Sequence, residues 1–328
     1  MDLEYIYTSA QCDVQDKRKL QAFRDKRRQW LSWIDTDEHH AIWTTLSAMV
    51  WREVSFKTLS KLAIMNEGGA LHNTILAESL FDGHLATQVL AIRRLADDGG
   101  GSIISLRKLF KDIKRHFELL TRENYVCFDG LPYDYAAIEY RVMVEHAGKG
   151  AFWGETAGPL AHGTSRMAHE QFDKLAGISP ANRQRDDRLP VSILATLDKW
   201  LDESGAEELA RWSHNYLAHA GGPESRSRIA ELSITAQKIA HAIRMLARVT
   251  EGISAYLLFA SGRSSALMPT AQFDVLEKLD QPVMQPDTEN DVRASWDALS
   301  TECDQYLDGV GEQLVHGAGH VKPSTFQG

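Results

Sequence analysis

The feature that most constrains the fold of this sequence is a long run of helical periodicity between residues 225 and 260. Apolar or small side chains recur there at alternating three- and four-residue spacing, which places them along one side of an α-helix. Two interleaved seven-residue series form this seam: Leu232, Ile239, Leu246 and Ile253, and Ala236, Ile243, Thr250 and Leu257. The pattern predicts one long helix whose seam packs against the same chain or against another subunit.

Helical periodicity also dominates the rest of the chain, and strand patterns are scarce. Turn-forming residues fill 124–132 and much of 148–190, where we expect loops and at most two short helical pieces. The sequence therefore predicts an all-α protein, a helical bundle with long helices and an extra C-terminal helix. The expected helices cover residues 17–34, 38–66, 71–96, 106–120, 133–146, 191–202, 206–220, 225–260 and 288–314.

Three regions follow from this pattern. Residues 1–36 are expected to form an N-terminal helical arm, and residues 37–260 a bundle with a loop-rich insertion near 148–190. Residues 261–328 combine a linker rich in Ser, Pro and Gln, a C-terminal helix and a tail expected to be flexible.

Composition narrows the class of protein. No apolar run approaches the ~20 residues that a membrane helix needs, and the first residues lack the basic head and apolar stretch of a signal peptide. We therefore expect a cytoplasmic protein that does not span a membrane. The three cysteines, Cys12, Cys127 and Cys303, have no CxxC spacing, which argues against a disulfide framework and a structural zinc site.

The formal net charge of −9 counts against broad, sequence-independent binding of nucleic acid along its backbone. Basic residues cluster at 17–28, 107–115 and 183–188, and we interpret these clusters as solvated helix faces or loops.

The tryptophans near the N-terminus have helical spacing, which favours core packing over a base-stacking platform. They are Trp30, Trp33, Trp43 and Trp51.

Neither a metal nor a cofactor is expected. The glycines after Asp97 and Asp98 lack the pattern of a phosphate-binding loop, and the histidines form no HExxH motif. A metal-dependent hydrolase would require several histidines to cluster with carboxylates. The histidines available for such a cluster are His84, His162, His169, His219 and His241.

The strongest candidate for a functional site is the helix predicted at 206–220, AEELARWSHNYLAHA. Arg211, Asn215 and His219 are four residues apart and would form one polar ridge. A guanidinium matches the oxygens of a phosphate, and an imidazole titrates near neutral pH. The ridge is therefore a candidate site for handling phosphate. Alternatively, its residues are a satisfied core histidine, a capping asparagine and a solvated arginine.

A second polar group lies on the helix predicted at 71–96. Glu78, Asp82 and Arg93 fall close to an apolar stripe that includes Leu85 and Val89. Polar groups beside buried positions need partners. They could support the site, or they could form a structural ion pair or an exposed edge.

The segment from His214 to His219, HNYLAH, resembles the signature of HEPN domains (higher eukaryotes and prokaryotes nucleotide-binding), an Arg-polar-x-x-x-His motif at a helix end. The sequence departs from this motif because His214 stands where the family has arginine. Arg211, the nearest arginine, lies one residue beyond the longest usual spacing.

Residues 91–114, AIRRLADDGGGSIISLRKLFKDIK, resemble the AbiU-type, abortive-infection branch of HEPN proteins. The two segments occur in the order of that family and would span about 38–260. The resemblance implies a protein of a prokaryotic defence or toxin-type system, a homodimer with RNA as substrate, and an antitoxin or other protein partner.

The resemblance also implies a metal-independent endoribonuclease, in which His219 acts as acid and base. Asn215 would assist it, and Arg211 or His214 would replace the missing arginine. The alternative is a catalytically inactive helical module that binds a protein partner or a second copy through the seam and the N-terminal arm.

Overall fold

The computed structural model describes residues 4–97, 103–147, 154–218, 234–260, 262–263, 267–283 and 288–305. The chain divides into two units, Met1–Thr270 and Ala271–Gly328. In the described part, regular structure is helical apart from one isolated β-bridge between Thr121 and Arg188. The prediction of an all-α protein is therefore confirmed.

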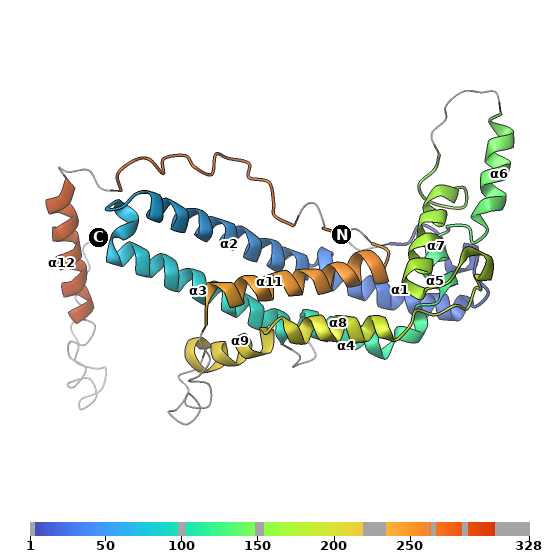
Figure 1. The fold of residues 1–328 in the computed structure, drawn as a ribbon, viewed down its shortest axis with the longest axis horizontal. Helices are drawn as coiled ribbons and strands as arrows, with labels where there is room; N and C mark the ends of the chain where they lie inside the picture. The colour runs from blue at the N-terminus through green and yellow to red at the C-terminus, as the bar shows by residue number, and fades with distance from the viewer. Residues whose placement is uncertain are drawn as a thin grey trace, which may run out of the picture. The chain divides into compact units, whose positions relative to one another are not determined.

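The centre of the first unit is the antiparallel hairpin of α2 (Ile42–Met65) and α3 (Thr74–Ala96). The helix α11 (Ala236–Glu251) packs against both of them (Figure 1). On the outside, α9 (Ala206–Ser213) lies along α3 and α8 (Ser192–Glu203) lies along α11. The long helices predicted at 38–66 and 71–96 are thus present, each starting a few residues later than expected.

The seam predicted at 225–260 is buried in this unit from Ile239 onward. Its members Ile239, Ile243, Leu246, Thr250, Ile253 and Leu257 are all at most 4% exposed. The helix begins at Ala236, where the Thr235 hydroxyl accepts a hydrogen bond from the Lys238 amide at 3.2 Å. Its partners α2, α3 and α8 belong to the same chain. From Ile239 onward the seam therefore offers no surface for docking; Ala236 is exposed, and the first seam residue, Leu232, lies outside the described residues.

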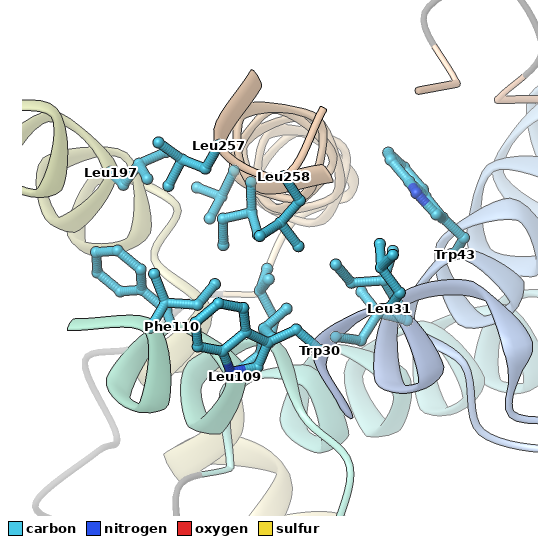
Figure 2. Close-up of a cluster of buried hydrophobic side chains, with 14 of the residues drawn as sticks. Trp30, Leu31, Trp43, Leu109, Phe110, Leu197, Leu257 and Leu258 are labelled. Carbon is cyan, nitrogen blue, oxygen red and sulfur yellow. The ribbon is translucent and has the colours of Figure 1, made fainter. Parts of the chain in front are cut away.

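The predicted N-terminal arm is part of this core. Helix α1 (Lys17–Leu31) buries Leu20, Phe23 and Trp30, and it continues into a π-helical turn, η2 (Ser32–Thr36). Figure 2 shows the Trp30 ring among side chains from distant parts of the chain, including Leu109 of α4 (Leu106–Arg115). Trp30 and Trp43 are both buried, and Trp33 and Trp51 are half-buried, as expected for core residues.

One end of the first unit consists of α5 (Arg122–Cys127), α6 (Tyr135–Glu145) and α7 (His162–Ala176) (Figure 1). The prediction of a turn at 124–132 is wrong for its first residues, because α5 is a fully buried helix. The prediction of only short pieces within 148–190 is wrong for α7, which has 15 residues. Three of the five buried residues of α7 are polar, namely Ser165, His169 and Asp173, so hydrophobic periodicity could not reveal it.

The second unit contains α12 (Glu289–Gln305). The helix was predicted to reach about residue 314, and residues 306–328 lie outside the described part of the chain. Its apolar side chains Val292, Trp296 and Leu299 are more than half exposed. None of the described helices in either unit has the length and apolarity needed to cross a membrane.

Candidate functional site

The helix predicted at 206–220 changes its geometry in the middle of the motif. It is α-helical over α9 and then widens into a π-helical turn, η6 (His214–Ala218). Before it, Gly205 has a φ of 67°, a left-handed conformation that favours glycine, and this residue separates α9 from α8. π-Helical turns are rare and often occur at functional sites.

The π turn alters the predicted polar ridge. Asn215 is half-buried and donates a hydrogen bond from Nδ2 to the Arg211 carbonyl oxygen at 2.8 Å, so these two residues stay adjacent. His214 and the Arg211 side chain are exposed. Because a π turn is wider than an α turn, a four-residue series does not stay on one ridge across it. His219, the proposed acid and base, lies outside the described residues.

The charges beside Arg211 leave its guanidinium available for an anion. Glu207 pairs with Arg107, with Oε1 and Nη2 at 2.8 Å, and Glu208 pairs with Lys238, with Oε1 and Nζ at 2.8 Å. Among the described residues, the Arg211 side chain has no ion pair or hydrogen bond of its own. The two acidic side chains on α9 are therefore compensated by other helices, while the arginine faces solvent.

Aromatic and hydroxyl side chains complete this turn. The rings of Trp212 and Tyr216 stack with their centroids 5.1 Å apart and an interplanar angle of 24°. Tyr216 and Leu217 are exposed. Ser213 is fully buried, and in the described part of the chain its hydroxyl has no hydrogen-bond partner. The turn thus presents an aromatic face beside a basic group.

The second predicted group lies on α3, which packs against the motif helix, but its side chains make no polar contact with the motif. Helix α3 packs along α9, so the two predicted groups lie on neighbouring helices. Glu78 and Asp82 are exposed, and Arg93 is half-buried. Among the described residues, none of these three side chains forms a hydrogen bond or an ion pair. They are near the motif helix without being joined to it.

Sequence reasoning missed a densely connected polar cluster, which we call the Arg122 network. Arg122 is fully buried and pairs through Nη1 with Asp173 Oδ1 at 2.7 Å and through Nε with Asp187 Oδ2 at 2.8 Å. Arg183 Nη2 contacts the other oxygen of Asp173 at 2.6 Å and Arg183 Nη1 donates to the Tyr135 hydroxyl at 3.0 Å. These bonds hold α5, α6, α7 and the segment after α7 together.

His169 lies beside the Arg122 network and is held neutral. Burial lowers the pKa of His169 to about 4, against the opposing effect of its hydrogen bond to the Tyr133 carbonyl oxygen, and the nearby guanidinium groups of Arg183 and Arg122 add to the lowering. The Tyr133 ring packs edge-on against it at 4.9 Å, and the Arg185 guanidinium carbon lies 4.0 Å from the centre of that ring. A neutral, buried histidine in such surroundings is a structural group.

The prediction that the basic clusters are solvated is wrong for several of their members. Arg24 and Arg27, within 17–28, are buried, and Arg183 and Arg185 are half-buried. The physical reason is that most of their partners are distant in the chain: Arg24 donates to the Phe128 carbonyl oxygen, Arg27 donates to the Leu258 carbonyl oxygen, and Arg185 Nη2 pairs with Asp13 at 2.9 Å. In the sequence, only the density of charged residues at 183–188 could have indicated that these arginines form ion pairs.

A separate polar pair, His84 and Glu53, lies between α2 and α3. His84 Nε2 is 3.3 Å from Glu53 Oε2, and the His84 ring stacks on Phe56 with centroids 4.0 Å apart. Burial lowers the pKa of His84, although the Glu53 carboxylate opposes this shift. Across the described ranges, no group of three or more histidine, cysteine, aspartate or glutamate side chains could hold a metal ion.

Fold and sites define an all-α protein with a basic, aromatic turn at the end of α9 and a separate buried ionic network. Comparison of the chain with protein-family models, with curated proteins and with solved structures finds no match.

Proposed function

We propose that this chain is a HEPN-like protein of a prokaryotic defence or toxin-type system, and that the turn formed by α9 and η6 is a metal-independent site for cleaving RNA. The proposal rests on the resemblance of residues 91–114 and 214–219 to that family. It also implies a homodimer, in which a second subunit can contribute to the same site.

One observation carries the proposal. Arg211 is an exposed cation beside the motif, and the neighbouring Glu207 and Glu208 are each neutralised by another basic side chain. An unneutralised guanidinium in this position can hold a phosphate with two parallel hydrogen bonds. The stacked pair Trp212 and Tyr216 supports the proposal further, because an exposed aromatic ring can stack on an RNA base.

The proposed chemistry needs only side chains. His219 takes the proton of a ribose 2′-hydroxyl, whose oxygen then bonds to the adjacent phosphorus. The bond from phosphorus to the 5′ oxygen breaks, and that oxygen takes up a proton. The products are a cyclic phosphate end and a 5′-hydroxyl end. Arg211 stabilises the added negative charge on the phosphate, with Asn215 or His214 assisting.

The test is RNA cleavage by the purified protein in the presence of a metal chelator. We expect the wild type to cut single-stranded RNA and His219→Ala to lose at least about a hundredfold in rate, as for removal of a general acid or base. Arg211→Ala should lose activity as well. Arg244→Ala is the matched control, because Arg244 is an exposed arginine on α11, outside the motif.

Provided that circular dichroism shows that all variants fold, three results would each contradict the proposal or part of it. Intact RNA across a broad panel of substrates would refute the proposed activity. Equal cleavage by wild type and His219→Ala would assign the activity to a contaminant. Loss of cleavage in Arg244→Ala as strong as that in Arg211→Ala would remove the special role of Arg211.

A second candidate function is a catalytically inactive interaction module, and a specific observation favours it. Near the tip of the hairpin of α2 and α3, the apolar side chains of Ile64, Met65, Ile75 and Phe81 are 82%, 72%, 58% and 51% exposed. Apolar surface of this kind marks interaction sites on soluble proteins. From Ile239 onward, the seam on α11 does not supply such a surface, because it is buried within the chain.

The molar mass in solution tests this alternative. If the hairpin tip binds a second copy, Ile64→Glu combined with Phe81→Glu should convert a dimer into a monomer, as measured by light scattering. Glu67→Lys, at the same end of the hairpin, is a control for added charge. A protein that is monomeric at all concentrations would refute self-association through this surface.

A further inference from the structure

A pocket lined by residues outside the motif carries an independent inference. It has a volume of about 420 Å³ and lies between α7, α8, α11 and the π-helical turn η7 (Gly252–Leu257) that continues α11. We infer that this pocket binds a small, flat apolar or aromatic molecule that carries a single anionic group, such as an aromatic carboxylate. Neither the motif nor the RNA-cleaving proposal involves its residues.

The lining of the pocket sets the apolar part of the ligand. Leu175 of α7, Ile193 and Leu197 of α8 and Leu257 of η7 contribute aliphatic surface, and Trp200 contributes a half-buried aromatic ring. Figure 2 shows Leu197 and Leu257 side by side where α8 meets the end of η7. A volume of about 420 Å³ falls in the usual range for small-molecule sites and suits a ligand of one or two fused rings.

The π turn on one side of the pocket is fixed by two buried side chains, Tyr125 and Arg27, and by the half-buried Gln171. The Tyr125 hydroxyl donates to the Tyr256 carbonyl oxygen at 2.7 Å, and Gln171 Nε2 donates to the Ala255 carbonyl oxygen at 2.6 Å. Arg27 donates from Nε and Nη2 to the Leu258 carbonyl oxygen at 3.1 and 3.0 Å. These donors come from α5, α7 and α1. A wall held in this way is preformed, which reduces the entropic cost of binding.

The charge in the pocket sets the polar part of the ligand. The guanidinium carbon of Arg248 lies 4.6 Å from the centre of the Trp200 ring, so the cation is held over the pocket by stacking. Arg248 is exposed, and in the described part of the chain it has no acidic partner. A guanidinium fixed on an aromatic face can pair with the anionic group of a ligand whose ring lies in the apolar space below.

A second charged residue limits the ligand to one negative charge. Glu251 also lines the pocket, and its Oε2 accepts a hydrogen bond from the Arg263 amide at 2.7 Å. Its carboxylate is therefore turned toward the backbone after η7 but still carries negative charge. A polyanion such as a nucleoside triphosphate would be repelled, while a single carboxylate next to Arg248 would not.

The test uses isothermal titration of the full chain with two probes, 1-naphthoate and the neutral 1-naphthalenemethanol. We expect saturable binding of the carboxylate with a dissociation constant on the order of 100 µM, and binding of the alcohol at least about tenfold weaker. Arg248→Met should weaken the binding of 1-naphthoate by at least about tenfold and leave the alcohol unchanged. Arg244→Met, one turn earlier on α11, is the matched control.

A second variant tests the position of the ligand without changing a charge. Thr196 lines the pocket but is itself exposed, so Thr196→Trp should fill the space and abolish binding of both probes without unfolding α8. Ala195→Trp, also exposed but outside the lining, is its control. The inference is overturned if neither probe binds, if the two bind equally well, if Arg248→Met and Arg244→Met bind 1-naphthoate equally, or if Thr196→Trp binds like wild type.

Discussion

At the scale of single residues, the Arg122 network shows how the chain keeps charges inside an apolar region. Arg122 is fully buried, and each of its two neighbouring carboxylates lies within 3 Å of it. Removing one partner of such a buried pair typically costs about 3–5 kcal/mol, because the remaining charge is left uncompensated. We therefore expect these residues to determine the stability of the lobe formed by α5, α6 and α7.

His169 makes the stability of this lobe depend on pH. Its pKa in the folded protein is about 4, mainly because of burial, and the usual value in an unfolded chain is about 6.5. Between these values the unfolded state binds a proton that the folded state excludes. The free energy of unfolding should therefore fall as pH drops from about 6.5 to about 4, by at most about 3 kcal/mol from this residue.

Urea unfolding of wild type and His169→Gln at several pH values measures this effect. Glutamine can still donate to the Tyr133 carbonyl oxygen but does not titrate. The variant should lose less stability than wild type over the same pH range. Parallel curves for the two proteins would show that another group is responsible for acid sensitivity.

At the scale of elements, the fixed π turn η7 is the clearest case of a local geometry maintained by distant side chains. Tyr125 is buried and serves two roles, since it donates to the Tyr256 carbonyl oxygen and accepts from Gln171 at 2.8 Å. Without the Tyr125 hydroxyl, the Tyr256 carbonyl oxygen would keep only the longer hydrogen bond from Gln171 Nε2, at 3.3 Å.

Tyr125→Phe should therefore lower the free energy of unfolding by about 1–3 kcal/mol. Tyr140→Phe is the control, because Tyr140 is 73% exposed on α6 and should tolerate the change. Equal stability of the two variants, measured by urea unfolding, would mean that the turn does not need this hydrogen bond.

The elements also show which parts of the fold could be predicted from sequence. Helices with clear apolar periodicity, such as α3, α8 and α11, are predicted within a few residues, apart from the N-terminal end of α11, because burial imposes a helical period on their residues. Helices α5 and α7 were missed, since their buried faces carry arginine, histidine and aspartate. Arg122 of α5 and its partner Asp173 of α7 are about fifty positions apart in the chain, and a local sequence pattern contains no information about such a pair.

The candidate site could be predicted only in part, for a related reason. The position of Arg211 on an exposed helical turn and its adjacency to Asn215 follow from helical spacing. The switch to a π turn at His214 does not, because it depends on how α9 ends against its neighbours. Nor could the pairing of Glu207 and Glu208 with Arg107 and Lys238 be inferred from one stretch of sequence.

At the scale of the whole molecule, the three cysteines form a natural set of probes for unfolding. Cys12 and Cys127 are buried, and burial raises the pKa of both thiols, whereas Cys303 in the second unit is exposed. A thiol reacts through its thiolate, so both burial and a raised pKa slow the reaction. One thiol per chain should react quickly with a thiol reagent in the native protein.

The remaining two thiols should react only at the rate at which the first unit opens. The absorbance of released thiolate measures both phases, and Cys303→Ser should remove the fast phase alone. A fast phase of two or three thiols in the wild type would show that the core around Cys12 and Cys127 opens readily.

The hydrogen bond between Arg27 and the Leu258 carbonyl oxygen also affects how the chain can fold while a ribosome is still making it. The two residues are separated by 231 positions, so the guanidinium of the first long helix has no backbone acceptor until nearly all of the first unit has been synthesised. Until then, burying α1 would leave the Arg27 guanidinium stacked on Phe128 but without these backbone acceptors, which is unfavourable. The nascent chain should therefore delay the docking of its first helix, and its exposed apolar face would be open to chaperones throughout synthesis.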